Sequence, residues 1–374
     1  MNSVIGNIPR RLFYCGSYVT ADNRRDSIMG IILVNSFLPE IQGCVPRNDD
    51  CSDVAIRLTQ DTLAGSTSND FLVYQMHQYC DVDVLLFPGM QLHINSEYYD
   101  LHPRHGLNVN GRYTFDYLPP KENVFVMGAH EDGPRSIRLP YMFMKWWTFS
   151  KGSKGEAFQP NFDSLFVPSA RPKNTKRHFL LYADSHYVNY REKAANAVSS
   201  IAPIHALGKC EGNVDAVPYV MDTKPPECIP FNDNSRPPSV IIADWNISDK
   251  FLNKRVSSEF RFVIAMENVK SPGYITEKIL DAFMAGSIPV YYGTTEIFDI
   301  FNPKAFIFYD IEKPQQALDR IAYLESNPDS YEKMLNEPIL AHGDKTIAKY
   351  FSFDDSIGNG VFKRKVREKL GFPV

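Results

Sequence analysis

The sequence predicts an α/β protein made of two domains with parallel sheets, and three observations support this. The stretch Phe260 to Gly293 has the pattern strand, loop, helix, strand. The N-terminal half repeats strand–loop–helix segments, which is typical of a sheet flanked by helices. Between the two lies a connection rich in Ser, Gly, Lys, Pro and Asn, from Ser150 to Lys176. A length of 374 residues fits two domains, and a single large domain stays open.

Composition narrows the class of protein. Hydrophobic residues make up 44% of the chain and aromatic residues 13%, as in soluble globular proteins with sizeable cores. The net charge of −4 and the lack of a basic block give no reason to expect a nucleic-acid partner. No apolar run approaches the length of a transmembrane helix, and the N-terminus lacks the apolar core of a signal peptide. We therefore expect no membrane segment in this chain.

Residues 1–160 are predicted to form the first domain. Short apolar runs bounded by turn residues predict its strands, and apolar spacing predicts one short helix. The expected strands are Arg11–Cys15, Ile28–Val34, Asp83–Phe87 and Val124–Met127, and the expected helix is Val54–Leu63.

Residues 161–176 are predicted to be a linker, residues 177–350 the second domain and residues 351–374 a tail that could pack back on the first domain. The same signals predict three strands and four helices in the second domain besides its organising unit. The strands are Phe179–Ala183, Ile204–Leu207 and Val240–Asp244, and the helices Val188–Ser199, Lys250–Val256, Gln315–Ser326 and Asp329–Leu335.

The organising unit of the second domain runs from Phe260 to Gly293. Phe262–Met266 and Ile288–Tyr292 read as buried strands, and Tyr274–Ala285 between them reads as a helix that Gly286 would end. Two strands joined in this way are parallel, with a right-handed crossover. Ligands of such sheets bind beyond the carboxyl ends of the strands, so the loop from Glu267 to Lys278 is the predicted site.

The side chains of this loop suit a nucleotide sugar. Thr276, Glu277 and Lys278 would occupy the first helical turn, whose free N–H groups favour a phosphate. Lys278 could neutralise a diphosphate leaving group, and Glu277 could accept hydrogen bonds from sugar or ribose hydroxyls. Tyr274 could pack on a ring, and Asn268 offers a donor and an acceptor. The alternative is an ordinary helix start with a solvated lysine.

The amino-acid sequence of this stretch resembles that of the α-1,3-fucosyltransferases, glycosyltransferase family ten. It looks closer to the bacterial branch of the family than to the vertebrate branch. The family signature is a strand ending in Glu-Asn, then Tyr-(Val/Ile)-Thr-Glu-Lys, a helix and a Pro-Val strand. It is matched here by Glu267, Asn268, Tyr274, Ile275, Thr276, Glu277, Lys278, Pro289 and Val290. The resemblance runs from Phe179 to Phe353. It implies the GT-B fold, two Rossmann-like domains facing a cleft, with the donor mainly on the second and the acceptor on the first.

The resemblance also implies a reaction: inverting transfer of L-fucose from GDP-fucose to a glycan hydroxyl, most simply the 3-OH of GlcNAc or Glc. Arg191 matches the family arginine that contacts the donor diphosphate, although by itself it reads as a surface arginine on a helix. Lys278 and Arg191 would stabilise departing GDP. Fucose and nucleotide would be held by the remaining donor-site residues, Glu267, Asn268, Tyr274, Thr276 and Glu277.

The general base is the weakest match. In the family, a glutamate follows a strand of the first domain. Glu131 occupies the matching position here, and the segment after it, residues 135–143, resembles the family sequence at that place. Glu97 is the rival, and His93 or His130 could serve chemically because imidazole titrates near neutrality. We predict Glu131 as the base, with an ordinary loop acid as the alternative.

No metal site is predicted. Asp81-Val82-Asp83 matches the Asp-x-Asp motif of metal-dependent glycosyltransferases. It precedes a predicted strand instead of following one, so we interpret it as the polar start of that strand. Cationic side chains can neutralise the diphosphate, so no cofactor is expected to be required, and stimulation by Mn²⁺ or Mg²⁺ stays open. The Walker A, GxGxxG and GxSxG motifs are absent from the sequence, which argues against a P-loop kinase, a dehydrogenase and an α/β-hydrolase.

Compartment and exact function stay open. Family resemblance suggests protein glycosylation in the Golgi lumen if the chain comes from a eukaryotic protein without its anchor, and a cytoplasmic location otherwise. Among the six cysteines, Cys44 with Cys51 and Cys210 with Cys228 could pair in an oxidising compartment. Two alternatives to fucose transfer remain: a glycosyltransferase of the same fold with another nucleotide sugar, and a non-catalytic protein that binds nucleotides or glycans.

Overall fold

The computed structural model describes just over half of the chain. The described residues are 11–14, 55–75, 82, 84–94, 106–107, 113–114, 121–129, 132–140, 178–184, 188–208, 216–217, 257–353 and 355–374. The chain divides into two compact units. The first unit comprises Met1–Pro160, Ser271–Glu277 and Asp344–Val374, and the second comprises Asn161–Lys270 and Lys278–Gly343. The predicted strands Ile28–Val34 and Val240–Asp244, the helix Lys250–Val256 and all six cysteines lie outside the described residues.

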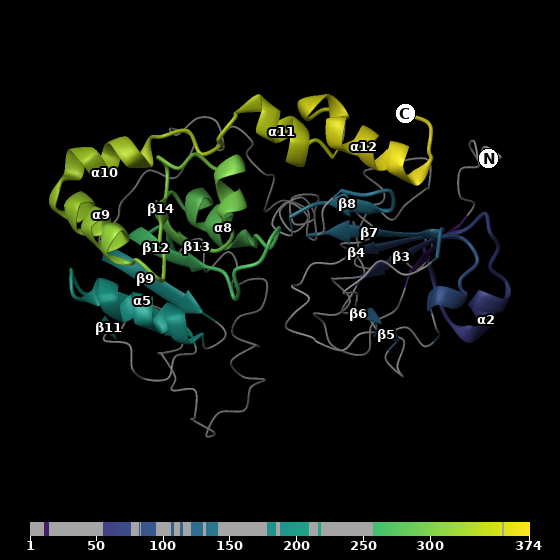
Figure 1. Cartoon of the computed structure of the whole chain (residues 1–374), viewed down its shortest axis with the longest axis horizontal. Coiled ribbons are helices and arrows are strands. Elements are labelled where there is room, and N and C mark those ends of the chain that lie inside the picture. The colour runs from purple at the N-terminus through teal and green to yellow at the C-terminus, as the bar shows by residue number, and fades with distance from the viewer. Residues whose placement is uncertain are drawn as a thin grey trace, which may run out of the picture. The chain divides into compact units, whose positions relative to one another are not determined.

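The first unit contains a six-stranded sheet with the order β2-β1-β3-β4-β7-β8, and all of its pairings are parallel. Figure 1 shows it in purple and blue. Its strands are β1 (Leu12–Tyr14), β2 (Ala55–Arg57), β3 (Phe71–Gln75), β4 (Met90–Ile94), β7 (Val124–Gly128) and β8 (Ser136–Arg138). A short antiparallel pair, β5 (Gly106–Leu107) with β6 (Tyr113–Thr114), lies apart from this sheet. The predicted strand Val124–Met127 is confirmed by β7.

Two sequence predictions in this unit are wrong. Val54–Leu63 is not one helix: its first part is β2, and the helix α2 (Gln60–Ala64) begins only after Thr59. The Thr59 side chain accepts a hydrogen bond from the Thr62 N–H, which caps the helix and fixes its start. Asp83–Phe87 is not a strand either. It contains a short 3₁₀ turn (Val84–Leu86), closed by the Phe87 N–H on the Val84 carbonyl at 3.1 Å.

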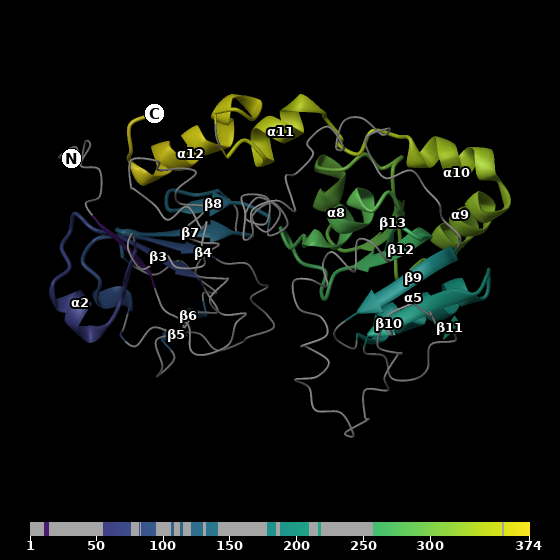
Figure 2. The same ribbon diagram turned by 180° about the vertical axis from the view of Figure 1, so that it is seen from behind.

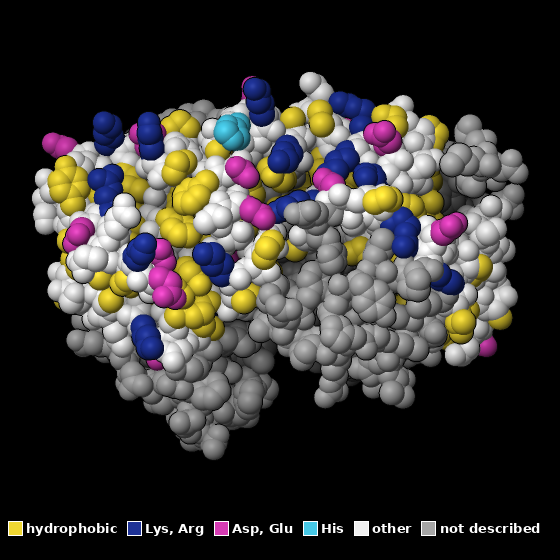
Figure 3. Space-filling model, in the orientation of Figure 1, with side chains coloured by type: hydrophobic (Ala, Val, Ile, Leu, Met, Phe, Trp, Pro, Cys, Tyr) yellow, Lys and Arg dark blue, Asp and Glu magenta, His cyan; other side chains and the backbone are white. Residues whose placement is uncertain are grey.

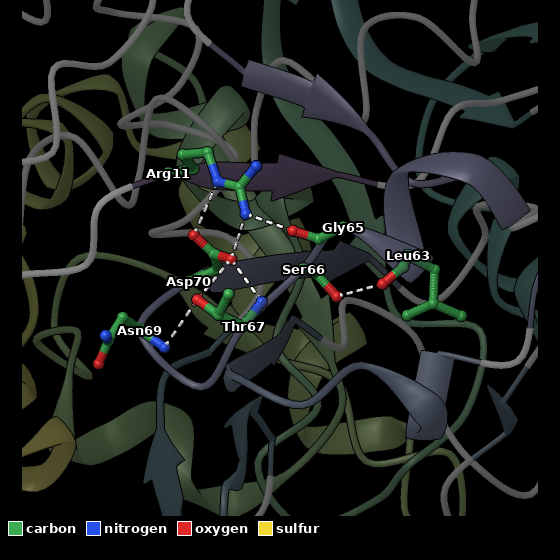
Figure 4. Close-up of polar contacts among 7 residues, drawn as sticks. All are labelled: Arg11, Leu63, Gly65, Ser66, Thr67, Asn69 and Asp70. Atoms are coloured by element: carbon green, nitrogen blue, oxygen red, sulfur yellow. Dashed lines mark hydrogen bonds and ion pairs between the residues drawn. The ribbon is translucent and has the colours of Figure 1, made fainter.

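An ion pair joins the starts of β1 and β3 (Figure 4). Arg11 donates from Nε to Asp70 Oδ1 at 3.0 Å and from Nη2 to Oδ2 at 2.8 Å. Oδ2 also accepts the Thr67 N–H at 2.7 Å and the Thr67 hydroxyl at 3.0 Å. Burial alone would raise the pKa of Asp70, but the bonds from Arg11 and Thr67 outweigh it and hold that pKa below its ordinary value.

We expect the Asp70→Asn substitution to lower the free energy of unfolding by about 1–3 kcal/mol, because it removes a buried, charge-assisted bond. A lowered carboxyl pKa stabilises the fold above the unfolded-state value of about 4, and this contribution disappears as the pH falls through the folded-state pKa. Denaturant titrations from pH 7 to pH 3 should show a smaller acid-induced loss in the variant. Asp355→Asn, at a side chain that is 72% exposed, is the control, and equal effects of the two changes would contradict the prediction.

The second unit is a three-layer αβα arrangement around a parallel sheet with the order β11-β10-β9-β12-β13-β14. Figure 2 shows this sheet in teal and green. Its strands are β9 (His178–Asp184), β10 (Ile204–Gly208), β11 (Ala216–Val217), β12 (Phe260–Met266), β13 (Ile288–Tyr292) and β14 (Ile307–Phe308). The predicted strands Phe179–Ala183, Ile204–Leu207, Phe262–Met266 and Ile288–Tyr292 are thus confirmed.

Helices cover both faces of this sheet, because its strands are apolar on both sides. Leu180 and Phe262 belong to the larger core cluster, together with buried residues of α5 (Asn189–Ser199), α9 (Gln315–Ser326) and α10 (Pro328–Leu335). Leu181 and Val263 point to the other face, where they pack with Ala282 of α8 (Glu277–Met284). The predictions for α5, α9 and α10 are confirmed to within one residue.

The start of α8 differs from the prediction by three residues. The helix begins at Glu277, not at Tyr274. Tyr274 instead closes a turn, in which its N–H donates to the Ser271 carbonyl at 3.2 Å. The predicted end is confirmed: Gly286 has a φ of 71°, and the Ser287 N–H bonds to the Ala282 carbonyl at 3.0 Å.

The chain ends in the first unit with α11 (Asp344–Tyr350) and α12 (Val361–Leu370). Phe362, Val366 and Leu370 of α12 are buried, and the ring of Phe372 beyond the helix lies 6.4 Å from that of Phe71 in β3. In Figure 3, basic side chains in dark blue lie over this yellow segment of Figure 1, with acidic side chains beside them. No helix in the described part of the chain is long and apolar enough to cross a membrane.

Candidate donor site of the second unit

The carboxyl ends of β9 and β12 bring the predicted donor-site residues of the second unit together. β9 ends at Asp184, and β12 is followed directly by Glu267 and Asn268. The two strands are parallel neighbours, so their carboxyl ends lie at the same edge of the sheet. The start of α5 brings Tyr190 and Arg191 to this edge. Polar side chains therefore gather where ligands of parallel α/β sheets bind.

Arg191 links the two strand ends. Its side chain is 1% exposed, so the interpretation as a surface arginine is wrong. Nη1 donates to Asp184 Oδ2 and Nη2 donates to Asn268 Oδ1. Nε is buried and has no hydrogen-bond partner among the described residues. The guanidinium therefore holds Asn268 in place, with its charge balanced by Asp184.

Glu267 is fully buried next to Asn268. Its backbone N–H donates to the Tyr292 carbonyl at 2.8 Å, and its own carbonyl accepts a bond from the Tyr190 hydroxyl. Burial raises the pKa of Tyr190 to about 12, so this hydroxyl stays protonated and remains a donor at neutral pH. Gly293 leaves room for the glutamate side chain, because a Cβ there would lie 2.9 Å from Glu267 Cγ and 2.3 Å from the Tyr291 hydroxyl.

Lys278 lies in the first turn of α8, as predicted. Its Nζ is 3.6 Å from Glu267 Oε2, and its side chain is 31% exposed. The lysine is thus held by a buried carboxylate yet still reaches solvent. A fixed cation of this kind, close to strand ends and at a helix start, can bind an anionic group.

The remaining donor-site residues belong to the part of the loop that groups with the first unit. Tyr274 and Thr276 are each 3% exposed, and Glu277 is the acidic residue of the first turn of α8. Thr276 precedes the helix, which corrects its predicted place in the first turn. Gly273 has a φ of 72°, and a Cβ there would lie 2.3 Å from the carbonyl oxygen of Ala129. The turn before α8 therefore contacts the residue that follows β7.

Of the four candidates for the base, His93 lies among the described residues. Glu131, Glu97 and His130 lie outside the described residues. His93 is buried in β4, where its Nε2 is 2.8 Å from Gln91 Oε1. Burial lowers the pKa of His93 to about 3, which leaves the imidazole a very weak base. His93 is therefore a poor candidate for the base.

Sequence reasoning missed Asp184 and Tyr190, which complete the site. The available signal was position: Asp184 is a polar residue at the end of an apolar strand, seven residues before an arginine. Within the described ranges, no group of three His, Cys, Asp or Glu side chains is arranged to hold a metal ion.

Residues 172–336 match the family model described as glycosyltransferase family 10 (fucosyltransferase) C-term. A protein of Acanthamoeba polyphaga mimivirus named "Putative fucosyltransferase" is 25% identical over 316 residues, which cover 81% of this chain and 48% of that protein. The α-(1,3)-fucosyltransferase of Helicobacter pylori is 38% identical over 94 residues, covering 25% of this chain and 19% of that enzyme. The chain thus spans about half the length, or less, of these two relatives.

A crystal structure of an α1,3-fucosyltransferase resembles the whole fold, with a TM-score of 0.50 and 16% identity, covering 90% of this chain and 84% of the other. Two parallel α/β units together with this likeness define the GT-B fold of glycosyltransferases. Residues 172–336, which contain Arg191, Glu267, Asn268 and Lys278, are thus similar to the C-terminal part of glycosyltransferase family 10, the fucosyltransferase family.

Proposed function

We propose that the chain is an inverting glycosyltransferase that moves L-fucose from GDP-fucose to a glycan hydroxyl, α-1,3 to GlcNAc or Glc. The observation that carries the proposal is the family match over residues 172–336, which contain the clustered residues Arg191, Glu267, Asn268 and Lys278. A related crystal structure of the same fold is described as an α1,3-fucosyltransferase with GDP-fucose, which supports this donor.

In the proposed reaction, an acceptor oxygen forms a bond to C1 of fucose while the bond from C1 to the phosphate oxygen breaks. GDP leaves with the bonding electrons, and the acceptor proton passes to a general base. Lys278 stabilises the charge that develops on the diphosphate. Arg191 holds Asn268 and supplies its free Nε–H to the donor, while Glu267 holds Lys278. Tyr274, Thr276 and Glu277 complete the binding of fucose and nucleotide.

We further propose Glu131 as the general base, with Glu97 as the rival. We expect Glu131→Gln to lower kcat by about two to four orders of magnitude, because an amide cannot take the acceptor proton. GDP affinity should be unchanged, and Glu97→Gln should retain activity. Steady-state kinetics with GDP titrations on both variants check this. The assignment fails if Glu97→Gln gives the large loss, or if neither variant is slow while GDP still binds.

The proposed function is tested by GDP or UDP release from a panel of nucleotide sugars, with and without a library of glycan acceptors. Acceptor-stimulated release from GDP-fucose alone is the expected result, and it should persist in EDTA, with Mn²⁺ or Mg²⁺ only stimulating. Release from a different donor would retain the fold and overturn the fucose assignment. GDP binding without release from any donor would favour a non-catalytic relative.

The compartment is also a proposal. We place the protein in the Golgi lumen, where it would modify glycoproteins, if its source is eukaryotic, and in the cytoplasm otherwise. Mass spectrometry of non-reduced peptides from the native source tests the first case, in which Cys210 can pair with Cys228. Six free thiols would argue against it.

A further inference from the structure

The connection between β7 and β8 is unusually short for one that joins two parallel neighbouring strands. The two strands are parallel, with Val126 opposite Ser136 and Gly128 opposite Arg138. Parallel neighbours are usually joined by a dozen or more residues that include a helix. Here the connection is seven residues long. Its described residues are Ala129 and 132–135, and we call these the β7–β8 loop.

Bonds within the first sheet fix the ends of this loop. The Leu139 N–H donates to the Gly128 carbonyl at 2.7 Å, and the Gly133 N–H donates to the Ser136 carbonyl at 3.1 Å. Asp132 Oδ1 accepts the Arg138 N–H at 2.9 Å. The other carboxylate oxygen of Asp132 and the Gly133 carbonyl bond to a distant part of the chain.

That distant part is α12. Lys365 Nζ lies 2.6 Å from Asp132 Oδ2, and Lys369 Nζ donates to the Gly133 carbonyl at 2.5 Å. Lysines four positions apart lie on one face of a helix, so both reach the same loop. The adjacent face of α12 is anchored by the buried apolar residues Phe362, Val366 and Leu370, which keeps the two lysines in register with the loop.

These bonds contribute little to overall stability. The side chains of Lys365 and Asp132 are 34% and 43% exposed, and exposed ion pairs are worth little in water. Their effect is local: they hold the middle of a loop that begins at the carboxyl end of β7, the edge of a parallel sheet where ligands bind. Ala129, at the start of the loop, is also the residue contacted by Gly273 in the turn before α8.

We propose that Lys365 and Lys369 are positioning residues for the acceptor, acting through Asp132 and the Gly133 carbonyl to fix the β7–β8 loop. This inference rests on the proposed function, because it takes the first unit as the acceptor side. The lysines do not touch the reacting atoms. They keep the loop in the conformation that the acceptor meets, which lowers the cost of ordering it on binding.

The test uses the full chain with Lys365→Met, Lys369→Met and the double substitution. Lys363→Met is the matched control, because Lys363 lies on the same helix and pairs with Asp355 in the tail at 2.7 Å, away from the loop. Amide hydrogen exchange measured without substrate reports the loop directly. We expect exchange at Gly133 and Arg138 to be about tenfold faster in the double variant and unchanged in Lys363→Met.

Kinetics provide the second measurement. The acceptor KM should rise about fivefold in the double variant, while the GDP-fucose KM and the GDP Kd stay constant. Lys365→Arg should have the acceptor KM of the unchanged chain, because arginine keeps a positive charge next to the Asp132 carboxylate.

Unchanged hydrogen exchange in the double variant would overturn the inference. Faster exchange with an unchanged acceptor KM would also overturn it, as would an equal rise in the KM values for acceptor and GDP-fucose. If the wild-type chain transfers no sugar, the proposed function fails and the acceptor role fails with it, while the exchange result still decides whether α12 holds the loop.

Discussion

Replacing Lys278 with methionine is expected to lower kcat for fucose transfer by about two to three orders of magnitude, the usual cost of removing a group that stabilises developing charge. The variant should fold with reduced stability, since the lysine side chain is 31% exposed but its partner Glu267, 3.6 Å away, is fully buried and loses a counterion. GDP affinity should fall, and guanosine affinity should stay constant, because only the diphosphate meets the lysine. Steady-state kinetics and calorimetric titrations measure these effects.

The control for this prediction lies in the same loop. Lys270 is exposed and carries the same charge, so Lys270→Met should leave kcat unchanged. Lys278→Arg should keep part of the activity, because the charge remains but its geometry changes. If Lys278→Met retained full kcat, or lost affinity for guanosine and GDP equally, the role of Lys278 at the diphosphate would be refuted.

Replacing Arg191 with methionine is expected to damage both stability and donor binding. The guanidinium is buried and holds Asp184 and Asn268, and removing one partner of a buried ion pair costs about 3–5 kcal/mol. GDP affinity should also fall, because Asn268 loses the bond that orients it. Thermal unfolding and GDP titration on the purified variant provide the two measurements.

A second variant separates the two effects. Adding Asp184→Asn to Arg191→Met removes the buried charge, so it should recover part of the stability but none of the GDP affinity. Arg261→Met is a matched control: Arg261 pairs with Glu325 between β12 and α9, and its side chain is 29% exposed. An equal loss of GDP affinity in the control would mean that the effect of Arg191 is only structural.

The parts of the fold that could be predicted from sequence are those in which local pattern and burial agree. β13 and α9 were located to the residue, because strand and helix periodicities are unambiguous there and Gly286 marks the end of α8. The error at the start of α8 arose because apolar residues there are buried without regular structure. Tyr274 and Ile275 continue the apolar spacing of α8, yet they are buried in the turn before it.

For the site, the sequence indicated which residues matter but not how they are held. Glu267, Asn268 and Lys278 are close in sequence, so their grouping could be predicted. The contact of Arg191 with Asn268 joins residues far apart in the chain, and the choice of Asp184 as counterion depends on the pairing of β9 with β12. Such contacts follow from sheet order, which local patterns do not contain.

The stretches of sequence that make up each compact unit determine where the chain can be cut to make fragments or chimeras. The first unit is assembled from three separate stretches, of which the last supplies α11 and α12. A fragment ending at residue 160 would lose the ring of Phe372 beside Phe71 and both lysine bonds to the β7–β8 loop. Exchanging halves with a relative at residue 160 would likewise separate Ala129 from the glycine turn that lies against it. Chimeric enzymes therefore need the tail and the turn before α8 to come from the same parent as the first sheet.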